Sequence, residues 1–411
     1  MVIQWFVVKH QKNNTTQMKM VKGIIKKGIK SFYAVCNYAL FLNKDLRKIK
    51  NCECLFFFPY YHTGGAEIVH TTILHAIKDK NCVVIFTMGS ATKSLYAAFN
   101  ASAEIIELNP ILNKRNNWIS KQLQKSIISA INQNNQLKNV FGCNTSYYYQ
   151  IISKLNSKIK KYDLFHAFEE NDSRISDIIN SASSIDKRIV INLKAKNDII
   201  AFYESHNVNN RFVKNIEIIQ NGIQIDQHVY TAKNDNLIKI GFVGRWSAEK
   251  RPEIFLEIAK KTKLVFPNVE FVMVGTGMKS NLELIHDAEV SFLGEITDKN
   301  KMKELYQSFH FILVTSVYEG FPMVMMEAMS HGVVPISTNV GGIKEHITHL
   351  KNGVLIDATE DEELVNLFCE QLHNLLNFPI DKNKISEAAF EYALLHFGIT
   401  KFNQSYQKIF S

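Results

Sequence analysis

Glu319 and Glu327, with seven residues between them, form the pair of side chains in this sequence whose spacing most suggests chemistry. The sequence Gly-Phe-Pro directly follows the first glutamate. The apolar, partly β-branched segment 311–315 predicts a buried strand, and Pro322 suits the first position of a following helix. We therefore expect Glu319 where the strand ends and Glu327 about five residues into the helix, roughly 7 Å along its axis.

A helix N-terminus lies between these two carboxylates, and its free N–H groups would attract an anion. One carboxylate at the loop, an anion site and a second carboxylate farther along could hold a sugar, a diphosphate and a ribose in that order. The alternative interpretation is a pair of surface glutamates on an ordinary helix.

Two cations lie in a second segment with suitable chemistry. Residues 241–252 predict a strand, a glycine turn and the start of a helix, and they carry Arg245 and Lys250. Arginine can bridge two phosphate oxygens, and lysine acts as a point charge. These cations suit a nucleotide diphosphate, although two solvated surface cations on a loop would leave the same pattern.

The elements that must position these residues alternate between short apolar runs and longer amphipathic ones, which predicts parallel sheets covered by helices. Predicted strands in the first half cover residues 54–58, 82–87, 104–108, 139–142, 164–168, 188–193 and 217–220. Predicted helices among them include residues 66–77, 116–132, 145–160, 174–180 and 198–206. After a polar linker, further strands are predicted at residues 238–243, 269–274, 290–293, 311–315 and 333–337. The run 385–409 predicts one helix.

The whole stretch from Glu319 to Ile347, rather than the glutamates alone, resembles the E-x7-E motif of retaining glycosyltransferases with the GT-B fold, particularly glycosyltransferase family 4 (glycosyl transferases group 1). The resemblance implies an α/β fold with two Rossmann-like, doubly wound parallel-sheet domains facing across a cleft, and a C-terminal helix that crosses back to the first domain. The boundaries we expect are a basic segment 1–50, an acceptor-side domain 51–222, a nucleotide-sugar domain 223–385 and a returning helix 386–411.

The same resemblance implies roles for individual residues. Arg245 and Lys250 match the family's G-R-x3-x-K segment, in which the cations neutralise the donor diphosphate. The family usually has glycine after that lysine, whereas Arg251 stands here. His166, in Asp163-Leu164-Phe165-His166, matches a strand-end histidine that points toward the donor sugar; a lone histidine there is otherwise more often structural.

By this resemblance, Glu319 orients the donor sugar and Glu327 accepts hydrogen bonds from the ribose, while Glu319 as a covalent nucleophile is a weaker alternative. The predicted catalytic residues are therefore Glu319, Arg245, Lys250 and His166. The predicted donor-binding residues are Gly65, in a loop that resembles G-G-x-E, and Gly244, Gly275, Ile296, Gly320, Phe321, Met323, Val324 and Glu327. Glu345 matches a G-G-x-x-E segment and is expected to be structural.

No metal and no other cofactor is expected. The sequence has no D-x-D, the paired aspartates typical of enzymes that hold a diphosphate through a divalent metal. Arg245, Lys250 and the helix N-terminus can supply the positive field instead. The six cysteines are scattered, and we expect them to be reduced thiols in a cytoplasmic protein.

The positive charge is concentrated at the N-terminus. Residues 1–50 carry eleven Lys/Arg and one acidic residue, whereas the remaining residues carry 37 basic and 38 acidic side chains. Residues 17–35 place apolar side chains on one helical face and lysines mostly off it, which is typical of a helix lying on an anionic membrane. A basic helix docked on the protein, or a partly disordered tail, is the alternative. No nucleic-acid partner is expected, because the body of the protein has no basic groove interleaved with aromatic residues.

The predicted function is transfer of a hexose-type sugar from a nucleotide-diphosphate sugar to an acceptor hydroxyl, with retention at the anomeric carbon. A lipid-linked or saccharide acceptor, polysaccharide or glycolipid biosynthesis, and a peripheral place on the inner face of the cytoplasmic membrane are the expected context. Two alternatives remain open: a GT-B protein that binds nucleotide sugars without transfer, and a nucleotide-sugar epimerase or hydrolase. UDP is favoured among donors only because it is frequent in the family.

Overall fold

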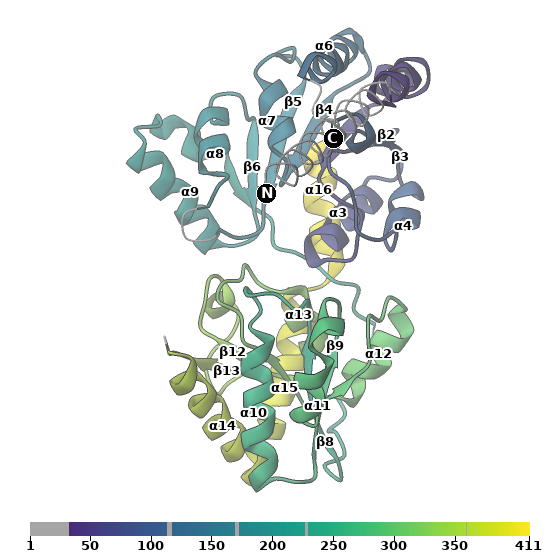
Figure 1. The fold of residues 1–411 in the computed structure, drawn as a ribbon. Coiled ribbons are helices and arrows are strands. Elements are labelled where there is room, and N and C mark those ends of the chain that lie inside the picture. The colour runs from purple at the N-terminus through teal and green to yellow at the C-terminus, as the bar shows by residue number, and fades with distance from the viewer. Residues whose placement is uncertain (1–32, 113–116, 169–171, 227–228, 359) are drawn as a thin grey trace, which may run out of the picture. The chain divides into compact units, whose positions relative to one another are not determined.

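The computed structural model describes residues 33–112, 117–168, 172–226, 229–358 and 360–411 (Figure 1). Its first sheet has seven strands in the order β3 (Glu104–Glu107), β2 (Cys82–Phe86), β1 (Cys54–Phe58), β4 (Asn139–Cys143), β5 (Lys160–Phe165), β6 (Lys187–Val190) and β7 (Ile216–Ile218). Its second has six, in the order β10 (Ser291–Phe292), β9 (Val269–Val274), β8 (Ile238–Val243), β11 (Phe311–Val314), β12 (Val334–Thr338) and β13 (Val354–Ile356). In both sheets chain order and spatial order differ, as in doubly wound folds.

Helices connect the strands of each sheet (Figure 1). Those around the first are α2 (Leu46–Asn51), α3 (Gly65–Ala76), α4 (Tyr96–Asn100), α5 (Asn109–Leu112), α6 (Asn117–Gln133), α7 (Ser146–Ile152), α8 (Ile175–Ser181) and α9 (Leu193–Ser205). Those around the second are α10 (Pro252–Val265), α11 (Leu282–Asp287), α12 (Lys299–Ser308), α13 (Met323–Met329), α14 (Asp361–Asn377) and α15 (Pro379–His396), followed by α16 (Ile399–Phe410). None of the helices in the described ranges combines the length and apolar character that a membrane span requires.

Each predicted strand has a counterpart in the structure, but the prediction for residues 164–168 is wrong in position. Strand β5 begins at Lys160 and ends at Phe165, and the predicted helix 145–160 ends earlier, at Ile152. The strand begins with two lysines, which are not typical of a buried strand, and its start was therefore predicted too late in the sequence. Lys161 is buried, and its Nζ donates hydrogen bonds to the carbonyls of Asn156 and Ile159, so the pattern of apolar residues did not mark it.

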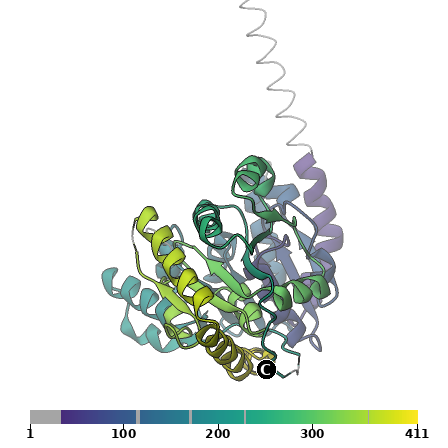
Figure 2. The ribbon, with the colours of Figure 1, turned by 90° about the horizontal axis from the view of Figure 1, so that it is seen from below.

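Contacts along the chain divide it into two compact units. Of the described residues, one contains those from Tyr33 to His62 together with Lys78–Tyr162, and the other contains Thr63–Ile77 together with Asp163–Ser411. In the first unit, α2 packs against α6, and Phe58, Phe86 and Phe99 are fully buried in contact with one another. In the second, α10 packs against α14 (Figure 2). Both helices contribute to the hydrophobic core that includes strands of the six-stranded sheet.

The C-terminal run that predicted one helix forms two. Helix α15 ends at His396, and α16 begins after Phe397 and Gly398. Helix α16 packs against α3 in the second unit, where Gln407 Nε2 donates to the carbonyl of Ala76 at 3.0 Å (Figure 1). The C-terminal run is therefore two helices, and the second of them contacts α3.

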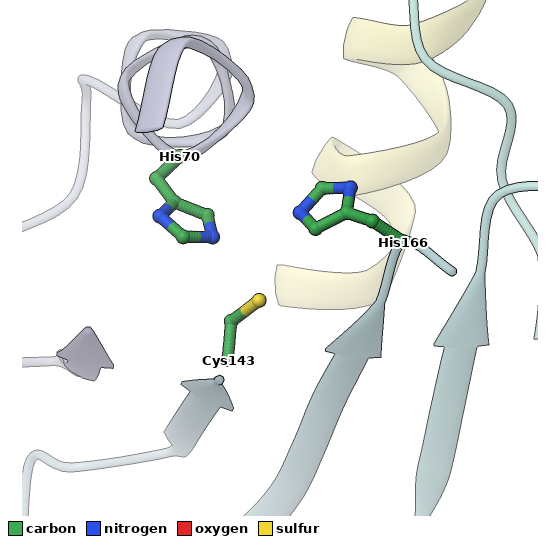
Figure 3. A group of neighbouring side chains, drawn as sticks. All are labelled: His70, Cys143 and His166. Atoms are coloured by element: carbon green, nitrogen blue, oxygen red, sulfur yellow. The ribbon is translucent and has the colours of Figure 1, made fainter. Parts of the chain in front are cut away.

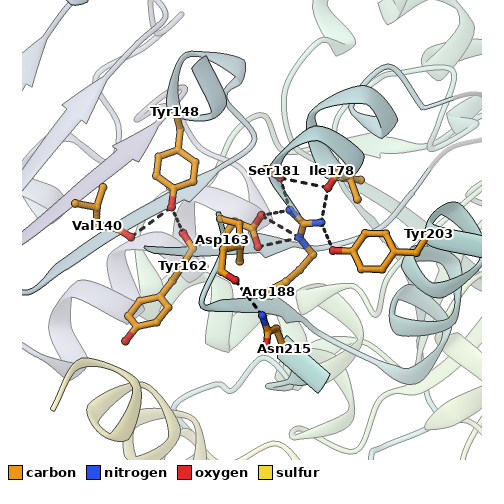
Figure 4. Close-up of polar contacts among 10 residues, drawn as sticks. Val140, Tyr148, Tyr162, Asp163, Ile178, Ser181, Arg188, Tyr203 and Asn215 are labelled. Atoms are coloured by element: carbon orange, nitrogen blue, oxygen red, sulfur yellow. Dashed lines mark hydrogen bonds and ion pairs between the residues drawn. The ribbon is translucent and has the colours of Figure 1, made fainter. Parts of the chain in front are cut away.

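A buried polar cluster fixes the end of the seven-stranded sheet that leads to His166 (Figure 4). Arg188 on β6 is fully buried and forms an ion pair with Asp163 on β5, with Nη2–Oδ2 at 2.7 Å. Its remaining N–H groups donate to Tyr203 of α9 and to Ser181 and the Ile178 carbonyl of α8. One guanidinium thus links two strands and two helices.

Candidate functional site

Glu319 lies in the loop after β11, almost completely buried, and its carboxylate is already engaged. Glu319 Oε1 accepts hydrogen bonds from Lys250 Nζ at 2.6 Å and from Ser316 Oγ at 2.7 Å. Lys250 also pairs with Glu249 Oε1 at 2.9 Å. Burial by itself would lower the pKa of Lys250, but the charges and hydrogen bonds of the two glutamates outweigh it and raise that pKa. The structure thus brings together one predicted cation and one predicted carboxylate.

Arg245, the other predicted cation, is exposed. Its side chain is 56% accessible, and Nη2 lies 3.7 Å from Glu249 Oε2. Because Glu249 also accepts from Lys250, this glutamate lies beside both predicted cations. The sequence did not single out Glu249, since a glutamate in the turn before a helix is common.

Glu327 lies on α13, on the fifth residue of the helix as predicted. Pro322 is the N-cap rather than the first helical residue, a difference of one position. Glu327 Oε2 accepts a hydrogen bond from the hydroxyl of Tyr306 on α12 at 2.7 Å. Burial raises the pKa of Glu327, while the Tyr306 hydrogen bond and the charge of Lys299 oppose that rise. Tyr306 itself is 2% exposed, and its pKa lies well above the usual value, first because of burial and then because of Glu327.

Gly320 lies directly against His166. A Cβ placed on Gly320 would come within 2.3 Å of the His166 carbonyl oxygen and 2.5 Å of Ile191 Cδ1, so a side chain there must displace the backbone. Gly65 is the first residue of α3, and a Cβ placed on it would lie 3.8 Å from Cγ of Met323, the first residue of α13. The second unit therefore gathers four predicted residues, Gly65, His166, Gly320 and Met323.

His166 directly follows β5, at the position that the resemblance implied. Burial, and then the charge of Arg174, lower its pKa to about 4, so the imidazole is neutral at pH 7. Its ring faces that of His70 on α3, with centroids 5.8 Å apart (Figure 3). Among the described residues, the group whose types and proximity could hold a metal ion is His70, His166 and Cys143, with ligand atoms within 4.8 Å of one another.

The remaining donor-binding predictions fall in three places. A Cβ on Gly275, whose φ is +140°, would lie 1.7 Å from the carbonyl oxygen of Gly244, so these two loops touch through backbone alone. Ile296 and Val324 pack against a small hydrophobic cluster that includes Tyr306. Phe321 lies elsewhere, buried against His346 and Phe397, with ring centroids 4.5 and 5.2 Å away. The ring of Phe321 therefore packs in the interior, and its contact with the donor stays a prediction.

Glu345 has the structural role that was expected. Its two carboxylate oxygens accept hydrogen bonds from the backbone N–H groups of Leu193 and Lys194, each at 2.8 Å. These are the first residues of α9, so the carboxylate satisfies free donors at a helix N-terminus.

Residues 224–391 match the family model of the glycosyl transferases group 1. Relatives align over shorter segments: an uncharacterised glycosyltransferase of Methanocaldococcus jannaschii is 35% identical over 28% of this chain and 30% of its own length. An alpha-1,4-N-acetyl-D-galactosaminyltransferase of Campylobacter jejuni, named as acting on a saccharide linked to undecaprenyl diphosphate, is 28% identical over 37% of this chain and 43% of its own length. The chain thus spans less than half the length of these curated relatives.

Solved structures match more of the chain. HepE of Anabaena in complex with UDP and glucose has a TM-score of 0.69 at 17% identity, covering 87% of this chain and 99% of that chain. A glycosyltransferase of Rickettsia africae has a TM-score of 0.65 at 18% identity, covering 88% and 98%. At these identities the likeness shows the fold, which is GT-B.

The matched segment contains Arg245, Lys250, Glu319 and Glu327, whereas Gly65 and His166 lie before it. It also contains two residues that sequence reasoning missed, Ser316 and Tyr306. A tyrosine on an amphipathic helix and a serine at a strand end are ordinary in sequence. Only their hydrogen bonds to the two glutamates distinguish them.

Proposed function

We propose that this protein is a retaining glycosyltransferase that moves a hexose-type sugar from a nucleotide-diphosphate sugar to an acceptor hydroxyl without a metal ion. The observation that carries the proposal is the pairing of Lys250 with Glu319 close to the His166 loop, with Glu327 held by Tyr306 on the adjacent helix. This arrangement offers a cation for a diphosphate and separate carboxylates for a sugar and a ribose.

The donor would be held by charge and by backbone. When a diphosphate enters, the cations Lys250 and Arg245 would exchange part of their pairing with Glu249 and Glu319 for phosphate oxygens. Glu319 would then accept hydrogen bonds from the sugar hydroxyls, and Glu327 would accept them from the ribose through the oxygen that Tyr306 leaves available. Neutral His166 can exchange hydrogen bonds with the sugar without repelling positive charge that develops on it.

Transfer would break the bond between the anomeric carbon and the diphosphate oxygen, with the electron pair leaving on the diphosphate. Lys250 and Arg245 would stabilise that negative charge. The acceptor hydroxyl would attack from the leaving-group face and pass its proton to a phosphate oxygen, so the anomeric configuration is kept. The hydrogen bonds of Lys250 and Ser316 to the Glu319 carboxylate argue against a covalent adduct on this residue, since they lower its nucleophilicity.

UDP is the nucleotide that we propose. HepE, a structure of the same fold, binds UDP and UDP-glucose. In this chain, the loops that contain Gly275 and Ile296 would contact the base largely through their backbone. For the acceptor, we propose a lipid-linked saccharide in polysaccharide or glycolipid biosynthesis, reached by a protein bound to the inner face of the cytoplasmic membrane. The basic segment 17–35 supports this context, and its residues 17–32 lie outside the described residues.

The test is a thermal-shift and calorimetric screen against UDP, GDP, ADP, CMP and their common sugars, with EDTA and then with Mg²⁺. We expect UDP and one UDP-sugar to bind without metal, and Lys250→Ala to weaken binding about tenfold to a hundredfold, as losing a charge-assisted hydrogen bond of about 1.5–3 kcal/mol implies. Lys279→Ala is the control, because it removes an exposed lysine of the short 3-10 helix Met278–Asn281.

Two outcomes would contradict the proposal. Tight binding with no transfer to any acceptor would indicate a nucleotide-sugar-binding protein. Donor consumption without an acceptor, or change of the sugar while it stays on the nucleotide, would indicate a hydrolase or an epimerase. The anomeric configuration of the product, read by NMR, decides between retention and inversion.

A further inference from the structure

Arg251, directly after Lys250, has a backbone conformation that arginine rarely adopts. Its φ is 45° and its ψ is 59°, in the left-handed region, at the N-cap of α10. A side chain in this region crowds the following carbonyl, and glycine is the residue that avoids the strain. Something at this position must therefore favour arginine over glycine.

The guanidinium of Arg251 supplies that reason. Its Nε donates to the carbonyl of Thr315 at 2.8 Å, and its Nη2 reaches the carbonyl of Ser316 at 3.4 Å. Both carbonyls lie just beyond the end of β11, where the sheet no longer pairs them in register. The third nitrogen, Nη1, faces the exposed Asp361 at 3.2 Å.

Three further hydrogen bonds join the same segments, in the opposite direction. Thr315 Oγ1 donates to the carbonyls of Lys250 and Arg251 at 2.7 and 3.0 Å. The N–H of Val317 donates to the carbonyl of Glu249 at 2.8 Å. Residues 249–251 and 315–317 are thus bonded side by side, and we call this set of contacts the seam.

The seam contains the two residues whose side chains bond Glu319, namely Lys250 and Ser316. Lys250 projects from one side of it, and Ser316, which bonds Glu319, lies on the other. Lys250 and Glu319 are 69 residues apart in sequence. The distance between their side chains therefore depends on how their two loops are joined.

We propose that Arg251 is a positioning residue: its guanidinium joins the lysine loop to the glutamate loop and so sets the place of Lys250 relative to Glu319 for sugar transfer. The inference rests on the proposed function for its consequence in catalysis, although the positioning itself can be measured without any donor.

The variant that tests it is Arg251→Gly, because glycine keeps the left-handed backbone and removes only the guanidinium. Glu289→Gly is the matched control: Glu289 also has a positive φ, of 52°, and is exposed at the end of α11, away from the seam. The first readout is the rate at which an acetylating N-hydroxysuccinimide ester labels Lys250 in the ligand-free protein, followed by peptide mass spectrometry. We expect labelling about tenfold faster in Arg251→Gly, with the melting temperature unchanged or higher.

The second readout is steady-state transfer from the UDP-sugar. We expect kcat to fall about tenfold to a hundredfold, with the donor KM changed much less, since misplacement of charge by a fraction of an ångström acts on the transition state. Added methylguanidinium should restore part of kcat in Arg251→Gly and leave Glu289→Gly unaffected.

The outcomes separate this inference from the proposed function. Unchanged Lys250 labelling in Arg251→Gly overturns the positioning role, whether or not the protein turns over. Faster labelling with unchanged kcat in an active enzyme overturns its relevance to transfer. A lower melting temperature that accounts for the whole loss of rate reduces Arg251 to a stabilising contact. If the wild-type protein neither binds nor turns over a nucleotide sugar, the proposed function fails. The labelling rate of Lys250 still decides whether Arg251 positions this lysine.

Discussion

Under the proposed function, the Tyr306 hydroxyl limits how the Glu327 carboxylate can bind a ribose. This hydroxyl occupies Oε2, so a ribose hydroxyl has Oε1 to approach. The hydrogen bond also favours the charged form of a carboxylate whose pKa burial raises. An anionic Glu327 is the better acceptor, so under the proposed function the protonation of this group would set donor affinity as the pH falls.

The first prediction concerns this pH dependence. Since the pKa of Glu327 is raised, UDP affinity should fall on acidification at a higher pH than an ordinary glutamate, with a pKa of about 4.3, would give. Tyr306→Phe removes a contact that lowers this pKa, so the fall should move to still higher pH. Calorimetric titrations across pH 4.5 to 8 measure it.

The control for this prediction is Tyr230→Phe, which removes a hydroxyl that bonds Ser386 and Asn383 instead of Glu327. Its affinity profile should match the wild-type profile. A Tyr306→Phe profile that keeps the wild-type midpoint, or moves to lower pH, would contradict the role assigned to this hydroxyl.

At the level of elements, the loop between β11 and α13 depends on a glycine. Gly320→Ala would place a methyl group 2.3 Å from the His166 carbonyl, which is backbone and cannot turn away. We expect a loss of about 1–3 kcal/mol in the free energy of unfolding, as for other overpacked sites, and a weaker donor affinity because Glu319 and Met323 flank the shifted loop.

Gly398→Ala is the comparison for this prediction, because a Cβ there meets nothing within 4 Å. It should change the free energy of unfolding by no more than about 0.5 kcal/mol. Chemical denaturation and UDP titration of both variants give the answer, and equal stability of the two would show that the His166 carbonyl can yield.

The strand pair that ends at His166 relies on a buried charge. Arg188→Met would leave Asp163 buried without its cation, at a cost of about 3–5 kcal/mol. The double variant Asp163→Leu/Arg188→Met removes both charges and should recover much of that loss. Urea unfolding measures both, and a double variant less stable than Arg188→Met alone would mean that the polar cluster of Figure 4 stabilises the fold beyond the pairing of its charges.

For the whole molecule, the uneven charge gives a prediction about location. Reversal of five lysines in the basic segment to glutamate should abolish binding to anionic vesicles, since each cation near such a surface contributes about 1 kcal/mol. Those lysines are Lys19, Lys22, Lys26, Lys27 and Lys30. Flotation with vesicles of phosphatidylglycerol measures it, and phosphatidylcholine vesicles are the control. Unchanged flotation would remove the membrane from the proposed function.

Several features followed from the sequence alone. The alternation of apolar and amphipathic runs predicted two parallel sheets, because strands buried on both faces must be apolar along their whole length. The places of Glu319, Glu327 and Lys250 at strand ends and helix starts followed from the same local patterns. The start of strand β5 was predicted wrongly, because Lys161 is buried in it. Its amine donates hydrogen bonds to backbone carbonyls, and a pattern of hydrophobicity does not record such contacts.

The tertiary structure decided which of these residues meet. Lys250 pairs with Glu319, Tyr306 with Glu327, and Arg251 with the end of β11, across separations of 69, 21 and 64 residues. Phe321 sits within the motif but packs against His346 and Phe397. Local propensity fixes where an element begins and which face is apolar, since both depend on near neighbours in the chain. The partner of a buried polar group depends on which loops the packed sheet brings together, and this is a property of the folded chain alone.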